Sequence, residues 1–338
     1  MRRAVDALMG EGVLEAATII PFLALLSLGH SSDEVNTATV DAARTLDATV
    51  ILWSHAEGLP VPKEVIAHLR RLPSRPALGH REGDAYCGWY KPLPATQWEL
   101  FPQCDVLFFP ARLRVLKQLR RVGCGDIRYV PSVTDEYRFG VDVAPRRSPE
   151  FDVVIIGNRV SSRVPFRTMP GARERVRLVR RFSREFGARF AVFGEGWSGA
   201  SAHGGVPFEE QTRAYARGRV VLANANLNAP YSFSNRLPIA MSSGVPVVHS
   251  ALRGSELLFG ERPPLRFFRD EDHALATTKE LLSLSQRELD AIGEIARGLA
   301  LSRFSMRFAL RYMVQALESV RGGVVDAPRN PWLPFEQL

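Results

Sequence analysis

Short apolar runs alternate with stretches of helical periodicity along the whole chain. In the first half, Thr49–Trp53, Asp105–Phe109 and Asp126–Val130 have the length and composition of buried strands. Helices are predicted over Pro62–Leu72 and near Leu113–Val122, where apolar residues recur at helical spacing. This alternation is typical of parallel sheets whose strands are joined by helices.

The second half repeats the alternation more regularly. Its predicted strands are Phe151–Ile156, Phe190–Phe193, Val220–Ala223, Pro246–His249 and Leu265–Phe268. Its predicted helices lie near Arg173–Phe186, Leu237–Met241, Asp272–Leu284, Arg287–Leu301 and Met306–Val320. We therefore predict an α/β fold with two Rossmann-type domains, each with a parallel sheet covered by helices, facing one another across a cleft.

The length of 338 residues agrees with two domains. The polar and irregular segment Pro131–Glu150 is expected to connect them. The predicted domains cover residues 1–140 and 151–317. Residues 318–338 form a tail that, by analogy with this architecture, packs back on the first domain.

Composition and charge narrow the class of protein. Apolar residues make up 46% and charged residues 24% of the chain, which favours a folded globular protein over a disordered one. The net charge of +8 suits a phosphate-bearing ligand, an anionic membrane surface or nucleic acid. No nucleic-acid-binding motif accompanies the arginines, so nucleic acid is not expected as a partner.

The cysteines and the N-terminal apolar segment bear on localisation. The three cysteines, Cys87, Cys104 and Cys124, have no metal-binding spacing and suit a reducing compartment. The apolar stretch Ala16–Gly29 is too short to span a bilayer and contains Pro21, so we interpret it as buried structure. We expect a cytoplasmic protein, with peripheral contact at the inner membrane face as a further expectation.

Ligands of open parallel sheets bind beyond the carboxyl ends of the strands, so the residues after each apolar run are the candidates. After the first two strands of the second half come Gly157, Asn158, Arg159 and then Gly194, Glu195, Gly196, Trp197. Glycines allow a close backbone approach, Asn and Arg bind phosphate or hydroxyl groups, and the indole offers a stacking face. Each turn could equally be an ordinary strand end.

The third and fourth strands of the second half lead to further polar turns. Ser234, Asn235 and Arg236 stand at the start of a helix, where Ser234 or Asn235 could serve as N-cap and Arg236 could bind an anion. Simple capping beside a surface arginine is the alternative. Later in the chain come Gly254, Ser255 and Glu256, a turn whose carboxylate could accept hydrogen bonds from a ribose.

These motifs together resemble the C-terminal domain of GT-B glycosyltransferases, especially the CgeB-like group and glycosyltransferase family 1 (group 1). The similar segments are Asn235-Arg236-Leu237, Ala240–Val248, Gly254–Phe259, Phe268-Arg269-Asp270 and Gly194–Trp197. The resemblance covers residues 151–317 and extends to the first half only in layout. It implies an acceptor domain over residues 1–140 and a nucleotide-sugar donor domain over 151–317.

The chain departs from the family's pattern at two positions. Many members have a glutamate that binds the donor ribose where this chain has Ile239, and retaining members have another where it has Tyr231. The resemblance still implies a metal-independent reaction without a cofactor, in which Arg236 and Arg159 neutralise the leaving diphosphate.

An inverting enzyme of this kind also needs a base that faces the acceptor hydroxyl. The candidates in the first half are His55, His80, Glu82 and Asp84, which follow or adjoin apolar runs.

The predicted function is transfer of a sugar, of the hexosyltransferase type, from a nucleotide-diphosphate donor to an acceptor that is a glycan, a lipid-linked molecule or a protein. The missing glutamates leave open a degenerate GT-B module that binds a glycan or partner without catalysis. A nucleotide-sugar epimerase is a further alternative.

Overall fold

The computed structural model describes residues 1–338 except 89, 141–148, 161, 163–166, 324–327 and 336–337. The chain forms two compact units. Unit 1 comprises Met1–Val130 and Ala309–Leu338, and unit 2 comprises Pro131–Phe308. Residues 131–140, which the sequence prediction gave to the first domain, therefore pack in unit 2. Residues 309–317 pack in unit 1.

Unit 1 is built on a parallel sheet with strand order β1-β2-β3-β4. Its strands are β1 (Val50–Ser54), β2 (Ala77–Arg81), β3 (Val106–Phe109) and β4 (Asp126–Tyr129). Its helices are α1 (Arg2–Gly10), α2 (Phe22–Ser27), α3 (Ser32–Thr45), α4 (Lys63–Arg70), α5 (Ala95–Leu100) and α6 (Val115–Arg121), with most of α14 (Met306–Arg321). In-register pairs such as Val50 with Ala77 and Gly79 with Val106 bring the carboxyl ends of β1, β2 and β3 to one edge.

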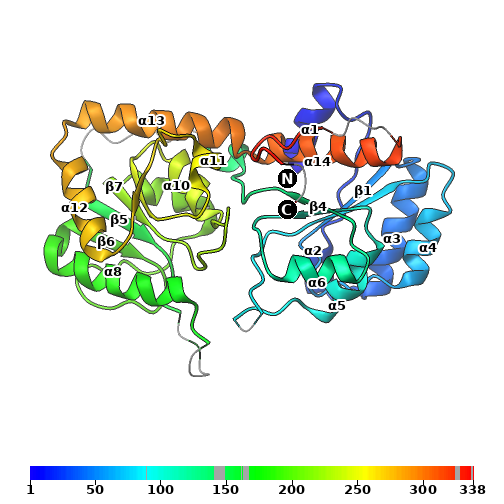
Figure 1. Ribbon diagram of the computed structural model, residues 1–338, viewed down its shortest axis with the longest axis horizontal. Helices are drawn as coiled ribbons and strands as arrows, with labels where there is room; N and C mark the ends of the chain where they lie inside the picture. The colour runs from blue at the N-terminus through cyan, green and yellow to red at the C-terminus, as the bar shows by residue number, and fades with distance from the viewer. Residues whose placement is uncertain (89, 141–148, 161, 163–166, 324–327, 336–337) are drawn as a thin grey trace. The chain divides into compact units, whose positions relative to one another are not determined.

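Unit 2 has a larger parallel sheet with strand order β6-β5-β7-β8-β9. Its strands are β5 (Phe151–Ile156), β6 (Phe190–Phe193), β7 (Gly218–Ala223), β8 (Val247–Ser250) and β9 (Arg266–Phe268). Its helices are α7 (Glu136–Phe139), α8 (Pro170–Phe186), α9 (Gln211–Tyr215), α10 (Arg236–Ser242), α11 (Ser255–Phe259), α12 (Glu271–Leu282) and α13 (Gln286–Arg303). Figure 1 shows α8 and α12 next to one another; α8 packs against β6, and α12 packs against β7, β8 and β9.

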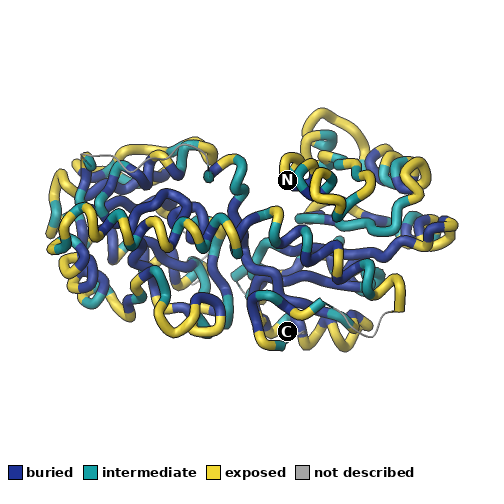
Figure 2. Tube along the Cα trace, turned by 90° about the horizontal axis from the view of Figure 1, so that it is seen from above, coloured by how far each residue is buried: buried dark blue, intermediate teal, exposed yellow. Residues whose placement is uncertain are grey.

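The cores form where the apolar pattern predicts them. In each unit the strands are the buried layer, while exposed positions concentrate on the outer faces of the helices (Figure 2). In unit 2, β5, β7 and α8 supply residues such as Val153, Val220 and Phe182 to a single core. Burial of such side chains is the main favourable term in folding. The predicted α/β fold with parallel sheets is therefore confirmed.

Two expectations about unit 1 differ from the structure. The strand β2 was missed, because its sequence, ALGHR, has no β-branched residue and ends in two polar ones. The interpretation of Ala16–Gly29 as buried structure is wrong: no residue of α2 is buried, and Leu28 is 77% exposed. Within the described residues, no helix combines the length and the apolar character that crossing a bilayer requires.

Candidate functional site

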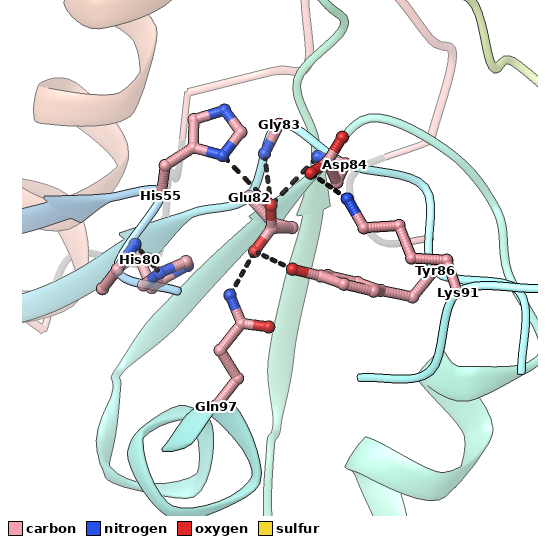
Figure 3. A network of polar contacts seen from close by, with 9 residues as sticks. His55, His80, Glu82, Gly83, Asp84, Tyr86, Lys91 and Gln97 are labelled. Atoms are coloured by element: carbon pink, nitrogen blue, oxygen red, sulfur yellow. Dashed lines mark hydrogen bonds and ion pairs between the residues drawn. The ribbon is translucent and has the colours of Figure 1, made fainter. Parts of the chain in front are cut away.

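The carboxyl ends of β1 and β2 carry a polar cluster, which we call the Glu82 cluster. Its members are His55, Glu82, Asp84, Tyr86, Lys91 and Gln97 (Figure 3). His55 follows β1 by one residue and extends the ladder, because its backbone N–H donates to the carbonyl of Arg81 at 3.1 Å. Glu82 follows β2 directly, and its N–H donates to the carbonyl of Phe108 at 2.8 Å. The sheet register therefore brings the two side chains together.

Glu82 is the centre of this cluster, and its side chain is fully buried. Its Oε1 accepts hydrogen bonds from the backbone N–H groups of Gly83 at 2.8 Å and Asp84 at 2.9 Å. Its Oε2 accepts from Gln97 Nε2 at 2.6 Å and from the Tyr86 hydroxyl at 3.3 Å. Burial raises the pKa of Glu82, and the hydrogen bonds from the backbone and from Gln97 oppose that rise.

His55 is the member of the cluster that combines contact with Glu82 and access to solvent. Its Nδ1 lies 3.5 Å from Glu82 Oε1, and its side chain is 43% exposed. The backbone of His55 has a φ of 55°, which is uncommon for a residue other than glycine. Burial, followed by the charge of Arg81, lowers the pKa of His55, so the imidazole is mainly neutral at pH 7.

The lack of a side chain at Gly83 leaves the space that the His55 imidazole occupies. A Cβ atom on Gly83 would lie 1.9 Å from Nε2 of His55. The ring therefore rests directly against the Gly83 backbone, and a larger residue would displace it. The arrangement of a half-exposed imidazole backed by a buried carboxylate resembles the base-and-orienter pairs that serve in proton transfer.

The other predicted catalytic residues occupy different environments. His80 is fully buried, packs against Phe101 at 4.7 Å between ring centroids, and accepts a hydrogen bond from the Ala56 N–H at 3.4 Å. Burial lowers its pKa to about 3. A side chain without exposed surface does not contact an acceptor, so its place in the structure is that of a core residue. Asp84 is half-exposed and forms an ion pair with Lys91.

The His55, Glu82 and Asp84 ligand atoms lie within 4.8 Å of one another, a spacing that a metal ion could use. Glu82, however, already accepts four hydrogen bonds from protein groups, and Lys91 neutralises Asp84. These contacts compete with a cation and favour acid–base chemistry at this cluster. The absence of a metal from the reaction stays a prediction.

In unit 2 the structure brings the two predicted glycine turns together at the ends of β5 and β6. The Glu195 N–H donates to Asn158 Oδ1 at 3.0 Å, and the Arg159 N–H donates to the Glu195 carbonyl at 2.8 Å. The Trp197 indole donates to the Gly157 carbonyl at 2.7 Å, and its ring packs partly against the core. The indole is therefore partly committed to the fold, while the Arg159 side chain is exposed.

Glycine is favoured at three of these positions for steric reasons. Gly194 has a φ of 141°, and a Cβ there would lie 2.5 Å from the Gly157 carbonyl oxygen. A Cβ on Gly157 would lie 2.9 Å from Nε of Arg175. At Gly196, with a φ of 81°, a Cβ would approach the Arg159 carbonyl to 3.2 Å.

A second polar cluster, which we call the Arg175 cluster, lies at the carboxyl ends of β5 and β7. Its members are Asn158, Glu174, Arg175, Asn224 and Asn226. Arg175 Nε donates to Asn224 Oδ1 at 3.0 Å, Nη1 to the Asn158 carbonyl at 3.0 Å, and Nη2 to Asn226 Oδ1 at 2.6 Å. Asn224 Nδ2 in turn donates to Glu174 Oε2 at 3.0 Å. The hydrogen bonds of Arg175 thus go to amide and carbonyl oxygens rather than to a carboxylate.

Arg236 lies close enough to this cluster for its positive charge to affect the pKa values of neighbouring residues. Burial, followed by the charge of Arg236, lowers the pKa of Arg175 to about 10. The same arginine opposes the burial-driven rise in the pKa of Tyr215, which reaches about 12. It also helps burial to lower the pKa of His249 to about 4. Among the described residues, the half-buried Arg236 side chain has no carboxylate partner. The carboxylate of the cluster, Glu174, accepts a hydrogen bond from Asn224 and forms no ion pair with either arginine, so two arginines are accompanied by one carboxylate.

The remaining predicted donor-site residues gather around Tyr231. The Tyr231 N–H donates to the Arg253 carbonyl at 2.8 Å, and a Cβ on Gly254 would lie 2.2 Å from the Tyr231 ring. Gly254 is the left-handed N-cap residue of α11, which begins at Ser255 and presents an exposed Glu256. Tyr231 thus occupies the space beside the turn that carries Glu256.

The start of α10 differs from the expectation. Asn235 occupies the N-cap position, but it has helical backbone angles and its side chain makes no capping hydrogen bond. Capping by Ser234 or Asn235 is therefore not seen, and the anion-binding potential of this turn rests on Arg236. Ile239 is only 1% exposed within α10.

The site residues that sequence reasoning missed come from the interior. Gln97 and Tyr86 are buried partners of Glu82, and Arg175 is a buried arginine on α8. One signal for Arg175 was present in the sequence. It lies at helical spacing from Ala172, Val179 and Phe182, on the stripe of α8 that packs against the sheet.

We compared the chain with known protein families, curated proteins and solved structures. Residues 167–315 match the family model described as glycosyl transferase-like. No curated protein matches the chain at the level of sequence.

Solved structures with a similar fold include the N-terminal domain of trehalose-6-phosphate phosphatase from Candida albicans, with a TM-score of 0.56 and 9% identity over 86% of this chain and 74% of that one. A glycosyltransferase from Rickettsia africae has a TM-score of 0.55 and 11% identity over 94% and 87% of the two chains. HepE from Anabaena, in complex with UDP and glucose, has a TM-score of 0.53 and 13% identity over 85% and 81%.

The expected resemblance to GT-B glycosyltransferases is therefore confirmed, whereas the CgeB-like group stays a prediction. Residues 167–315 carry the sequence pattern of glycosyl transferase-like proteins, and the chain has the α/β architecture of GT-B glycosyltransferases.

Proposed function

We propose that this protein transfers a sugar from a nucleotide-diphosphate donor to an acceptor hydroxyl group, without a metal ion. The observation that carries the proposal is the pair of Arg236 and the buried Arg175, accompanied by the single carboxylate of Glu174, at the strand ends of the unit that matches the glycosyl transferase-like family. A diphosphate would supply the negative charge that Glu174 alone does not provide.

On the donor side, Arg236 would contact the diphosphate directly because it is half-buried, whereas Arg175 is only 2% exposed. Arg175 would act through its hydrogen bonds, which hold Asn158 and Asn226 at the ends of β5 and β7. The exposed Glu256 on α11 is our proposal for the ribose contact, since Ile239 is buried and apolar. The solved HepE complex contains UDP and glucose, and the same class of donor is proposed for this chain.

On the acceptor side, the neutral imidazole of His55 would accept the proton of the acceptor hydroxyl. The acceptor oxygen then forms a bond to the anomeric carbon of the sugar, and the bond from that carbon to the diphosphate oxygen breaks. The diphosphate leaves with the bonding electron pair, and Arg236 neutralises its charge. Glu82, at 3.5 Å from Nδ1, stabilises the imidazolium that forms. A base of this kind, together with the absence of a glutamate at Tyr231, favours inversion.

Nucleotide binding tests the proposal directly. Nucleoside diphosphates at millimolar concentration should raise the melting temperature of the full chain, since a ligand that binds only the folded state stabilises it. Arg236→Gln should weaken the binding of the stabilising nucleotide by about tenfold or more, because it removes a charge-assisted hydrogen bond. Arg213→Gln is the matched control, since Arg213 lies on the exposed side of α9 and pairs with Glu210.

The result that would overturn the donor assignment is equal nucleotide affinity in the Arg236→Gln and Arg213→Gln variants. If no nucleoside diphosphate shifts the melting temperature, the proposed transferase activity fails as well.

A second candidate function is a module that binds a nucleotide or glycan without catalysis. The replacement of both customary glutamates, by Tyr231 and Ile239, favours it. The two functions differ in turnover: a transferase releases nucleoside diphosphate from its nucleotide-sugar, whereas a binding module returns the donor intact.

A further inference from the structure

A cavity of about 540 Å³ lies at the edge of the unit 1 sheet opposite the Glu82 cluster. It is lined by residues at the amino ends of two strands, since Ala77 begins β2 and Asp105 immediately precedes β3. His55 and Glu82, by contrast, follow the carboxyl ends of β1 and β2. The volume lies within the range of small-molecule sites. The proposed function makes no use of this cavity.

The charged residues around the cavity leave an excess of positive charge. Three arginines line it, Arg70, Arg75 and Arg321, against one carboxylate, Asp105. Asp105 is already occupied, because its two oxygens accept from Arg70 at 2.8 and 2.9 Å. Arg70 is therefore neutralised within the protein, and Arg321 is paired with Glu318, so the charge of Arg75 remains.

Arg75 and Arg321 retain free hydrogen-bond donors. Arg321 uses its Nε to donate to the Ser74 carbonyl at 3.0 Å, and its Nη1 lies 3.4 Å from Glu318. Arg75 is exposed and has a φ of 46°, and its side chain has no hydrogen bond or ion pair with any described residue. The rim of the cavity thus offers the guanidinium of Arg75 and the second terminal nitrogen of Arg321.

Ser74 contributes an unpaired hydroxyl group beside the cavity. The residue lines the cavity and is 8% exposed, yet its buried hydroxyl has no hydrogen-bond partner among the described residues. Leaving such a group unpaired costs free energy, so native proteins rarely do it without a reason. Pro73 and Pro76 form an apolar wall beside this hydroxyl.

We propose that this cavity binds a small phosphate monoester. A phosphate group has three terminal acceptor oxygens and a double negative charge near neutral pH, which match two guanidinium groups and one hydroxyl. The proline wall provides an apolar surface for the organic part of the ligand. Because the cavity and the Glu82 cluster lie at opposite edges of one sheet, the ligand would bind apart from the transferred sugar.

The test must separate this cavity from phosphate binding at Arg236. The reference is therefore the full-length protein carrying Arg236→Gln. Its binding of glucose 6-phosphate is measured by titration calorimetry, and its binding of inorganic phosphate is measured in the same way. The reference protein should bind glucose 6-phosphate, and more tightly than inorganic phosphate because of the apolar wall. Adding Arg75→Gln should weaken that binding by about tenfold, the effect of one charge-assisted hydrogen bond.

Two further variants guard against indirect effects. Arg71→Gln removes an equally exposed arginine, four residues away, that does not line the cavity, and it should leave binding unchanged. Ser74→Ala should weaken binding severalfold without lowering the melting temperature, because the hydroxyl it removes has no partner in the protein.

The proposal is overturned if the reference protein binds neither phosphate compound at millimolar concentration. It is also overturned if Arg75→Gln and Arg71→Gln bind equally well. Neither result affects nucleotide binding at Arg236, which is measured in protein with an intact Arg236, so the two proposals fail separately.

Discussion

The two units each place one buried charged residue at the centre of a polar cluster, and the two charges have opposite signs. In unit 1 the buried Glu82 accepts hydrogen bonds from amide and hydroxyl donors and contacts one imidazole. In unit 2 the buried Arg175 donates to amide and carbonyl oxygens and lies beside a second arginine, Arg236. The first arrangement suits proton transfer, and the second, with two arginines and the one carboxylate of Glu174, suits anion binding.

The two units also differ in what their closely packed glycines contact. Gly83 in unit 1 leaves room for a side chain, the imidazole of His55, whereas Gly194 in unit 2 leaves room for backbone at Gly157. A side chain can move aside and a backbone segment held in a sheet cannot. Substitution should therefore impair function in unit 1 and stability in unit 2.

The largest expected effect is on the chemical step and arises in unit 1. His55→Asn should lower the rate of nucleoside diphosphate release from the nucleotide-sugar by about 10²- to 10⁴-fold, the usual contribution of a general base. Donor affinity, measured by equilibrium binding, should stay unchanged because His55 belongs to unit 1. A variant that keeps the full single-turnover rate would exclude His55 as the base.

The next largest effect is on stability in unit 2. Gly194→Ala should lower the free energy of unfolding by about 2–4 kcal/mol, because its φ of 141° and the carbonyl at 2.5 Å both oppose a Cβ atom. Gly199→Ala is the matched control, with a φ of 97° but open space around it, and should cost about 1 kcal/mol. Urea denaturation measures both. Equal costs would mean that the close approach to Gly157 is unimportant.

A smaller effect should follow from crowding His55. Gly83→Ala should reduce the transfer rate about tenfold, since the ring must leave its contact with Glu82, while unfolding free energy changes by less than about 1 kcal/mol. Gly125→Ala, where no atom lies within 4 Å, should change neither quantity. A large loss of stability in Gly83→Ala would show that the imidazole is fixed as firmly as the backbone of unit 2.

A further effect should appear in the pH dependence of stability. Each unit buries one histidine whose pKa is lowered, His80 to about 3 and His249 to about 4. A lowered pKa in the folded state means that the unfolded chain binds protons first, so stability is full above about pH 6.5 and falls below it.

The expected loss is up to about 1.4 kcal/mol per pH unit for each histidine between pH 6.5 and 4. Below about pH 4 only the His80 contribution should continue to fall. Urea titrations at several pH values measure the slope, and His80→Gln should reduce it. An unchanged slope in that variant would indicate that His80 is protonated in the folded protein.

Much of the fold could be predicted because strand and helix periodicities are local properties. The apolar runs at β1 and at β3 to β9 match the structure to within a few residues. The strand β2 could not be predicted in this way, since its weak strand sequence is held by pairing with β1 on one side and β3 on the other. The segment Ala16–Gly29 is apolar but exposed. An apolar run is buried only where another part of the fold packs against it, and the local sequence does not show this.

Some residues of the candidate site could likewise be predicted from the sequence, and others could not. The strand-end rule led to His55, Glu82, Asp84 and the Gly157 turn, because it depends only on where strands stop. It could not distinguish His55 from His80, since the alternation of faces along β2 and the packing of Phe101 decide which histidine meets solvent.

The sequence by itself determined the parallel α/β fold, the glycine-rich and polar turns at the strand ends of the second half, and the surplus of arginine. Only the tertiary structure decided that Tyr86 and Gln97 bind Glu82, and that Arg175 and Arg236 share one region with Glu174. The physical reason is that periodicity and turn chemistry act between near neighbours in the chain. Charge compensation depends on distances between residues that lie far apart in the sequence.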